Sequence, residues 1–186
     1  FKTRNDEYKR SCHESSIRIP TALTGGPFAG GGQLRQLVSL VDLPPTLLDA
    51  CGLAVPPAMQ GRSILPLVRH QAVDWPEEVF VQISEAQVAR AVRTRRWKYC
   101  VSAPDKNAWR EPGSEHYVEH YLYDLQSDPH ELTNLVGLKS HDSVAAALRE
   151  RLLRRMAAAG EAAARILPAS PGESGQRRVF PGEERE

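Results

Sequence analysis

Residues 143–167, SVAAALRERLLRRMAAAGEAAARIL, carry the most regular apolar pattern in the chain. Val144, Leu148, Leu152 and Met156 recur every four residues, with arginines at positions between them. Residues three or four positions apart lie on the same face of an α-helix. The pattern therefore predicts a long amphipathic helix over residues 143–167, and its apolar face needs a second element to cover it.

Three segments rich in β-branched and aromatic residues precede this helix and can supply the covering layer. They span residues 79–84, 90–101 and 121–125, and Thr94 to Arg96 are expected to form a tight turn between two arms of a hairpin. A polar loop over residues 103–115 joins the second segment to the third. We therefore expect a small antiparallel sheet packed against the helix, which makes this part of the chain α+β.

The N-terminal part is expected to contain a strand followed by a loop. Residues 16–23, SIRIPTAL, alternate apolar and polar positions, which predicts a strand with Pro20 at an edge or bend. The glycine-rich residues 24–33 predict a loop, and they lack the spacing of a phosphate-binding loop.

Residues 42–52 predict a short helix. Asp42 stands at its start, prolines follow in the first turn, and Gly52 is suited to end it. At helical spacing, Leu47, Leu48 and Cys51 are expected to pack inward.

The composition changes near Arg69, beyond a proline-broken, largely extended stretch. We therefore divide the chain into residues 1–68, residues 69–167 and a tail, 168–186. The tail is rich in proline, glycine and charge, and this composition predicts disorder.

Charge and hydropathy exclude several classes of partner. The 24 Lys and Arg residues against 23 Asp and Glu leave a net charge of +1, which argues against a nucleic-acid or anionic-membrane partner. No apolar run approaches the ~20 residues that a membrane span needs. The first residue is Phe1 rather than Met, so we expect the chain to begin inside a longer protein, with any targeting signal outside the sequence.

The cysteines do not form a recognisable framework. Cys12, Cys51 and Cys100 are odd in number and far apart, and they contain no CxxC pair. We expect free buried thiols, which favour a reducing, cytoplasmic interior.

Two local clusters resemble catalytic motifs without meeting their structural requirements. HYVEH, from His116 to His120, has the order of a zinc-peptidase motif, but that chemistry needs a helix and the motif runs into the strand-like residues 121–125. A solvated loop and strand start is therefore favoured. Cys12 and His13 are neighbours, and adjacent residues on a strand point to opposite faces, so we predict no activated thiol there.

Four motifs occur together in an order that indicates a family. They are KRSCHESSIRIP, VSLVDLPPTLLDACGLAVPPAMQGRSILPLV, AVRTRRWKY and LYDLQSDPHELTNLV. In this order and spacing they resemble the formylglycine-dependent sulfatases of the alkaline phosphatase superfamily.

The resemblance implies hydrolysis of a sulfate ester by a gem-diol nucleophile made from cysteine or serine. It also implies a divalent metal, usually calcium, held by carboxylates and an amide. The implied fold is a large α/β domain followed by a smaller domain with a four-stranded antiparallel sheet and a packed helix. This chain would hold the end of the former and the whole of the latter.

Only one catalytic position of the family carries over to this sequence. It is Lys9, which the resemblance implies contacts a sulfate oxygen and stabilises leaving-group charge. The nucleophile motif C-x-P-S-R is absent, so we expect the nucleophile and the metal ligands to lie before Phe1, and the chain alone to be inactive. Glu14 and Arg18 are interpreted as structural.

The substrate implied by the resemblance is a small-molecule or carbohydrate sulfate ester. The 103–120 region offers Lys106, Trp109, Arg110 and His116 as candidate contacts to its leaving group, although an ordinary mobile surface loop is the favoured alternative. Two other functions stay open: a phosphonate or phosphate ester hydrolase of the same superfamily, and a non-catalytic interaction module derived from a sulfatase C-terminal region.

Overall fold

The computed structural model describes residues 10–169, and these form two compact units. One unit combines residues up to Ile19 with those from Phe80 onward, and the other comprises Pro20–Val79. Lys9 and most of the tail predicted to be disordered lie outside the described residues. No helix among residues 10–169 is both long and apolar enough to cross a membrane.

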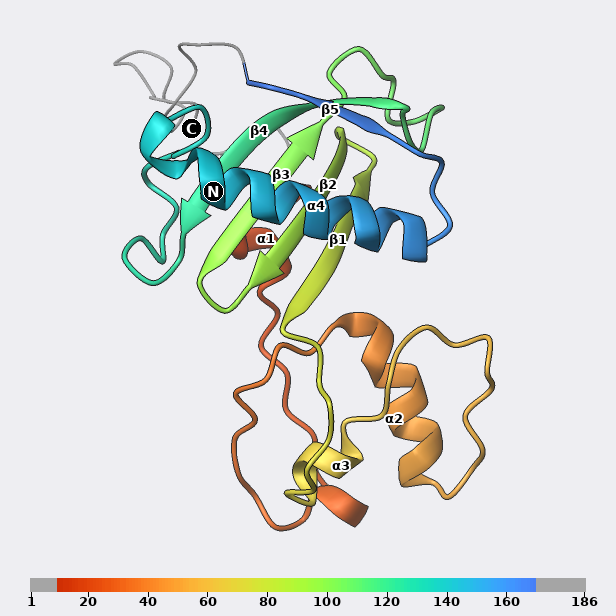
Figure 1. The fold of residues 1–186 in the computed structure, drawn as a ribbon. Helices are drawn as coiled ribbons and strands as arrows, with labels where there is room; N and C mark the ends of the chain where they lie inside the picture. The colour runs from red at the N-terminus through yellow and green to blue at the C-terminus, as the bar shows by residue number, and fades with distance from the viewer. Residues whose placement is uncertain (1–9, 170–186) are drawn as a thin grey trace, which may run out of the picture. The chain divides into compact units, whose positions relative to one another are not determined.

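A five-stranded sheet forms the centre of the first unit (Figure 1). Its strands lie in sequence order: β1 (Glu78–Ser84), β2 (Val88–Thr94), β3 (Trp97–Ser102), β4 (His116–Asp124) and β5 (Arg165–Leu167). The pairs β2–β3 and β3–β4 are antiparallel, which confirms the predicted hairpin and third strand. The register shifts between Cys100 and Val101, and β5 joins β4 in parallel, two features that the sequence pattern did not predict.

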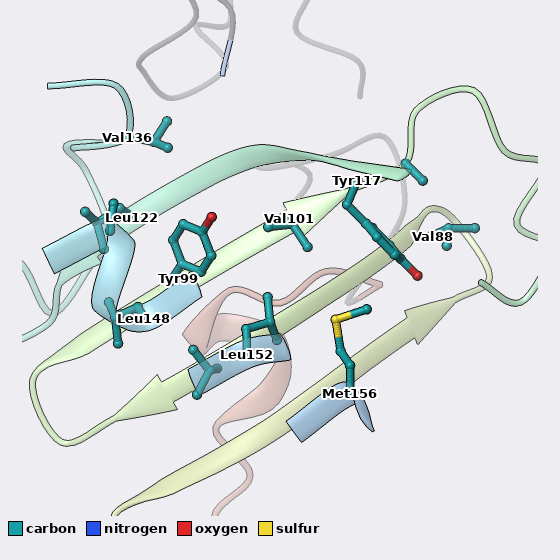
Figure 2. Packing of buried hydrophobic residues seen from close by; sticks show 12 residues of the cluster. Val88, Tyr99, Val101, Tyr117, Leu122, Val136, Leu148, Leu152 and Met156 are labelled. Carbon is teal, nitrogen blue, oxygen red and sulfur yellow. The ribbon is translucent and has the colours of Figure 1, made fainter. Parts of the chain in front are cut away.

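Helix α4 (Asp142–Ala158) lies across one face of the sheet (Figure 1). Leu148, Leu152 and Met156 are buried and point toward the sheet, as the four-residue recurrence predicts (Figure 2). They join a core cluster with Tyr99 of β3 and Tyr117 of β4. Burial of side chains of this size contributes roughly 1.5–3 kcal/mol each.

The predicted helix extends nine residues too far, to residue 167 rather than 158, because the observed helix ends where a glycine reverses the chain. Gly160 has φ of +80°, a left-handed conformation that favours glycine, and the Glu161 amide donates to the carbonyl of Met156 at 3.0 Å. The chain then turns back, and residues 165–167, predicted as helix, form β5 instead.

The opposite face of the sheet is covered by the N-terminal segment, residues 10–17. The strand predicted over residues 16–23 is wrong: residues 14–17 form a single helical turn, α1 (Glu14–Ile17), and the residues after it have no regular structure. The turn forms because the amides of Ser16 and Arg18 donate to the carbonyls of His13 and Glu14 at 2.8 and 2.9 Å.

The second unit contains short helices joined by extended chain. They are η1 (Gly26–Phe28), η2 (Leu40–Asp42), α2 (Leu43–Ala50) and α3 (Leu65–Val68). Prolines occupy the first turn of α2, and Gly52 follows its end with φ of +72°, as predicted.

The predicted inward packing of α2 is wrong for two of three residues. Leu47 is 56% exposed and Cys51 is also exposed. The buried residues of α2 are instead Pro45 and Thr46, because that side of the helix meets the chain that runs into α3.

Candidate functional site

The segment that follows Lys9 is fixed at one end of the sheet. Arg10 forms a 3.0 Å ion pair with Glu85, in the turn between β1 and β2. Its guanidinium also lies 5.7 Å from the ring centre of Trp109, in the loop between β3 and β4. The residue directly after Lys9 therefore contacts both the β1–β2 turn and the candidate substrate loop.

Glu14 anchors this segment through a cluster of buried charges. Its carboxylate accepts hydrogen bonds from Arg93 of β2 at 3.4 and 3.2 Å, and it lies 3.3 Å from Nζ of Lys98. Lys98, on β3, is fully buried and also pairs with Glu131. Glu131 in turn accepts the backbone amide of Glu14 at 2.8 Å.

The structural role predicted for Glu14 is confirmed by these contacts. Arg18 is exposed, and its backbone amide closes the turn of α1. Lys98 and Glu131 were not recognised from the sequence. The only sequence signal for Lys98 is its position between two aromatic residues of a strand. Glu131 has no such signal, because the φ of +57° that distinguishes it in its loop cannot be seen in the sequence.

The charge cluster predicts a loss of stability in acid. Burial by itself raises the pKa of Glu14, but the hydrogen bonds from Arg93 and the charge of Lys98 hold that pKa below its ordinary value of 4.5. A carboxyl group whose pKa is lower in the folded than in the unfolded state stabilises the folded protein at pH values above the unfolded-state pKa. This stabilisation is lost as the pH falls through the folded-state pKa. We expect the urea midpoint to change little between pH 7 and pH 5 and to decrease at pH values below about 4.5.

Glu14→Gln supplies the control for this pH dependence. The variant is expected to be less stable at pH 7 and to show a shallower decline in acid, because it lacks the titrating carboxylate. Parallel declines for the two proteins would contradict the assignment to Glu14.

Cys12 and His13 belong to the packing beneath this segment. Cys12 is fully buried. The His13 ring stacks on Tyr121 with centres 4.5 Å apart, and its Nδ1 and Nε2 atoms lie 3.1 Å from the Ser11 hydroxyl and 3.4 Å from the Tyr123 hydroxyl. The burial predicted for Cys12 is confirmed by this environment.

The loop over residues 103–115 carries three of the candidate substrate contacts. Lys106 pairs with Glu111 at 2.9 Å, and the other Glu111 oxygen accepts the Asn107 amide at 3.0 Å. These bonds tie the loop to itself and present Trp109, which is 71% exposed, toward solvent together with Arg110. The fourth candidate, His116, is exposed at the start of β4.

The structure brings only some of these candidates together. Lys106 and His116 line an open hollow of about 670 Å³, whereas Trp109 and Arg110 are not among its lining residues. The hollow also contains Ser84, Arg90 and Glu161, none of which was a candidate from the sequence.

Arg90 is held in place by the surrounding groups. Its guanidinium donates to Glu161 and to the carbonyl of Pro112, both at 2.6 Å, and to the carbonyl of Ala89 at 2.9 Å. It is 3% exposed, so its hydrogen-bonding capacity is largely used within the protein. Arg90 therefore links the β3–β4 loop to the chain after α4.

The HYVEH motif lies in β4, which begins earlier than predicted. Residues 116–120 are strand rather than loop. Two residues four positions apart on a strand are separated by roughly 13 Å, too far for both to bind one zinc ion. Within residues 10–169, no three His, Cys, Asp or Glu side chains gather in a way that could hold a metal ion.

The sequence comparisons agree with the fold. Residues 6–158 match the family described as N-sulphoglucosamine sulphohydrolase, C-terminal. Human arylsulfatase K is 33% identical over 138 residues, which cover 69% of this chain and 24% of that protein. The chain thus spans about a quarter of the length of the curated relatives it matches.

Solved structures give the same result for the fold. A 2-O GAG sulfatase matches with a TM-score of 0.52 and 26% identity, over 64% of this chain and 24% of the other. A phosphonate monoester hydrolase from Silicibacter pomeroyi matches with a TM-score of 0.51 and 24% identity, over 65% and 25%. The family match identifies this chain as a C-terminal part of a sulfatase.

The chain belongs to the N-sulphoglucosamine sulphohydrolase C-terminal family. The predicted resemblance and fold class are therefore confirmed.

Proposed function

We propose that this chain forms part of a sulfuric ester hydrolase that cleaves sulfate esters with a formylglycine nucleophile. Lys9 binds a sulfate oxygen in this scheme and stabilises the negative charge that develops on the leaving group. The nucleophile is supplied by residues outside the 186-residue sequence, because none of its three cysteines is followed by the modification motif.

The observation that carries this proposal is the anchoring of Glu14. The family pattern places a glutamate five residues after the sulfate-contacting lysine, and here that glutamate is bound to Arg93 and Lys98 of the sheet. A point charge stabilises a transition state best when it is held in position beforehand. Anchoring Glu14 limits the movement of residues 10–17, which follow Lys9 in the sequence.

Exposed apolar side chains in the second unit support the idea that it completes a larger catalytic domain. Residues 20–79 bury few large apolar side chains, while seven others in this range are between 37% and 59% exposed. Several exposed apolar side chains in one unit are typical of a surface that contacts another protein or domain. They are Val38, Leu40, Val41, Leu47, Leu53, Val55 and Val73.

A divalent metal, usually calcium in this family, belongs to the proposed reaction. Residues 10–169 do not fit such an ion, since they contain no group of three suitable side chains, so we assign its ligands to residues outside this range. The metal would supply charge stabilisation to the sulfate group when bound.

The β3–β4 loop is proposed to contact the leaving group. Trp109 is exposed and lies beside Arg10, the residue directly after Lys9, so its indole can pack against a ring attached to the bound sulfate. Lys106, Arg110 and His116 add positive or polar groups nearby in the chain. A relative in the structural comparison is named as a 2-O GAG sulfatase, which favours a sulfated carbohydrate as substrate here.

Lys9→Ala in the full-length protein tests the catalytic assignment. Removing one charge that stabilises the transition state is expected to lower kcat/KM for an aryl sulfate by about 10²–10³-fold. Lys139→Ala is the control, because Lys139 is an exposed lysine on η3 (Lys139–His141), and it should leave turnover unchanged. Full activity of Lys9→Ala, or turnover by the 186-residue chain alone, would contradict the proposal.

A phosphonate or phosphate ester hydrolase is the second candidate, favoured by the similar fold of a phosphonate monoester hydrolase. Parallel assays of the full-length protein with an aryl sulfate, an aryl phosphate and an aryl phosphonate monoester distinguish the two. Turnover of none of the three would favour the non-catalytic interaction module.

A further inference from the structure

Two buried cysteines meet where the N-terminal segment crosses the sheet. Cys12 and Cys100 are both 0% exposed and belong to one apolar cluster. Cys100 lies in the middle of the sheet, where it pairs with Ala91 of β2 and with Tyr121 of β4. Cys12, from the N-terminal segment, belongs to the same buried cluster, so the two thiols share one apolar environment.

Small residues allow the segment to approach the sheet this closely. Ala89 and Ala91 of β2 point to the same face as Cys100 and are fully buried in the same cluster. Larger side chains at these positions would hold the segment away from β3. Cys51, the third cysteine, is exposed and lies in the other unit.

The environment of the two thiols makes them unequal. The neighbouring Cys100 side chain lowers the pKa of the Cys12 thiol, whereas burial raises the pKa of the Cys100 thiol. Cys12 is therefore the more readily ionised of the two, and the thiolate is the form that attacks a disulfide.

We propose that Cys12 and Cys100 form a reversible disulfide that locks the N-terminal segment onto the sheet. The oxidant is a low-molecular-weight disulfide, RSSR. On local opening of the segment, the Cys12 thiolate attacks one sulfur of RSSR and releases RS⁻. Cys100 then loses its proton, and its sulfur attacks the Cys12 sulfur and displaces the second RS⁻. Two protein thiols and RSSR become one protein disulfide and two RSH.

The disulfide has a structural consequence at the residues that carry the ion cluster. Cys12 lies two residues before Glu14, so the covalent bond holds the same short segment that Glu14 holds through charge. The bond closes a loop of about 90 residues, and the loss of chain entropy in the unfolded state resists unfolding. The oxidised protein should therefore keep this segment in place even in acid, where Glu14 loses its charge.

Peptide mapping of the full-length Cys51→Ser protein tests the proposal. This variant removes an exposed thiol that could compete and keeps both buried ones. After incubation with oxidised glutathione, a non-reducing digest should contain the Cys12 and Cys100 peptides joined, 2 Da lighter than their sum. The melting temperature should rise by roughly 5–15 °C and return to its starting value on addition of dithiothreitol.

Cys51→Ser with Cys100→Ala serves as the matched control, because it keeps Cys12 and lacks its partner. It should give no intramolecular link and no rise in melting temperature on oxidation. Recovery of Cys12 and Cys100 as free thiols after oxidation of the Cys51→Ser protein would overturn the proposal. So would links between two copies of the chain in place of the Cys12–Cys100 bond.

Discussion

Lys98→Ala should destabilise the first unit by about 3–5 kcal/mol, a cost typical of breaking a buried ion pair by removing one partner. Lys98 is fully buried on β3 and pairs with both Glu14 and Glu131. Without the Lys98 ammonium, the buried Glu131 carboxylate loses the cation with which it pairs. Glu14 keeps its ion pair with Arg93. Urea unfolding at pH 7 measures the loss, and amide exchange of β3 shows whether it arises in the sheet.

Two variants separate charge from packing in this result. Lys98→Met keeps most of the side-chain volume and should still cost several kcal/mol, because the buried Glu131 carboxylate loses its cation. Adding Glu131→Gln to Lys98→Met should recover part of the loss, since it removes a buried charge. Lys139→Ala, at an exposed site, should change stability by less than about 0.5 kcal/mol. A Lys98→Ala protein as stable as Lys139→Ala would refute the energetic role of the cluster.

Periodicity predicted the parts of the fold that local pattern controls. The recurrence of Leu148, Leu152 and Met156 located the buried face of α4, and the strand-like composition located β1 to β3. It failed where the outcome depends on distant partners. Residues 165–167 continue an alanine-rich helical pattern, but Gly160 ends the helix and the chain then pairs with β4. Residues 16–23 alternate like a strand but have no strand beside them.

The candidate site shows the same division. The order of the four motifs indicated the family and Lys9, because each motif is a short continuous stretch that can be recognised in the sequence alone. The anchor of that segment depends on Arg93, Lys98 and Glu131, which are 79 to 117 residues away from Glu14. No local pattern connects residues at such separations. The contact between Arg10 and Trp109, 99 residues apart in the sequence, could not be predicted from a local pattern either.

The motif GRS, residues 61–63, has a steric explanation in the second unit. A Cβ atom on Gly61 would lie 1.8 Å from the backbone oxygen of Val41, far inside van der Waals contact. The close approach lets the amide of Arg62 donate to the Asp42 carboxylate at 2.9 Å. The amide of Ile64 likewise donates to the Thr46 hydroxyl at 3.0 Å. The chain before α3 is thus bound to the start of α2 by two backbone amides that donate to the side chains of Asp42 and Thr46.

Gly61→Ala should therefore cost about 3 kcal/mol or more, at the upper end of the range for overpacking, because the obstructing atom belongs to the backbone and cannot rotate away. Hydrogen exchange by mass spectrometry should show the loss of protection confined to residues 39–65, with the sheet of the first unit unaffected. Gly30→Ala is the matched control: no atom lies within 4 Å of its Cβ position and its φ is not left-handed. That variant should be neutral or slightly stabilising, since alanine reduces the entropy of the unfolded chain. Equal stability of the two variants would show that the second unit does not depend on the contact between Gly61 and Val41.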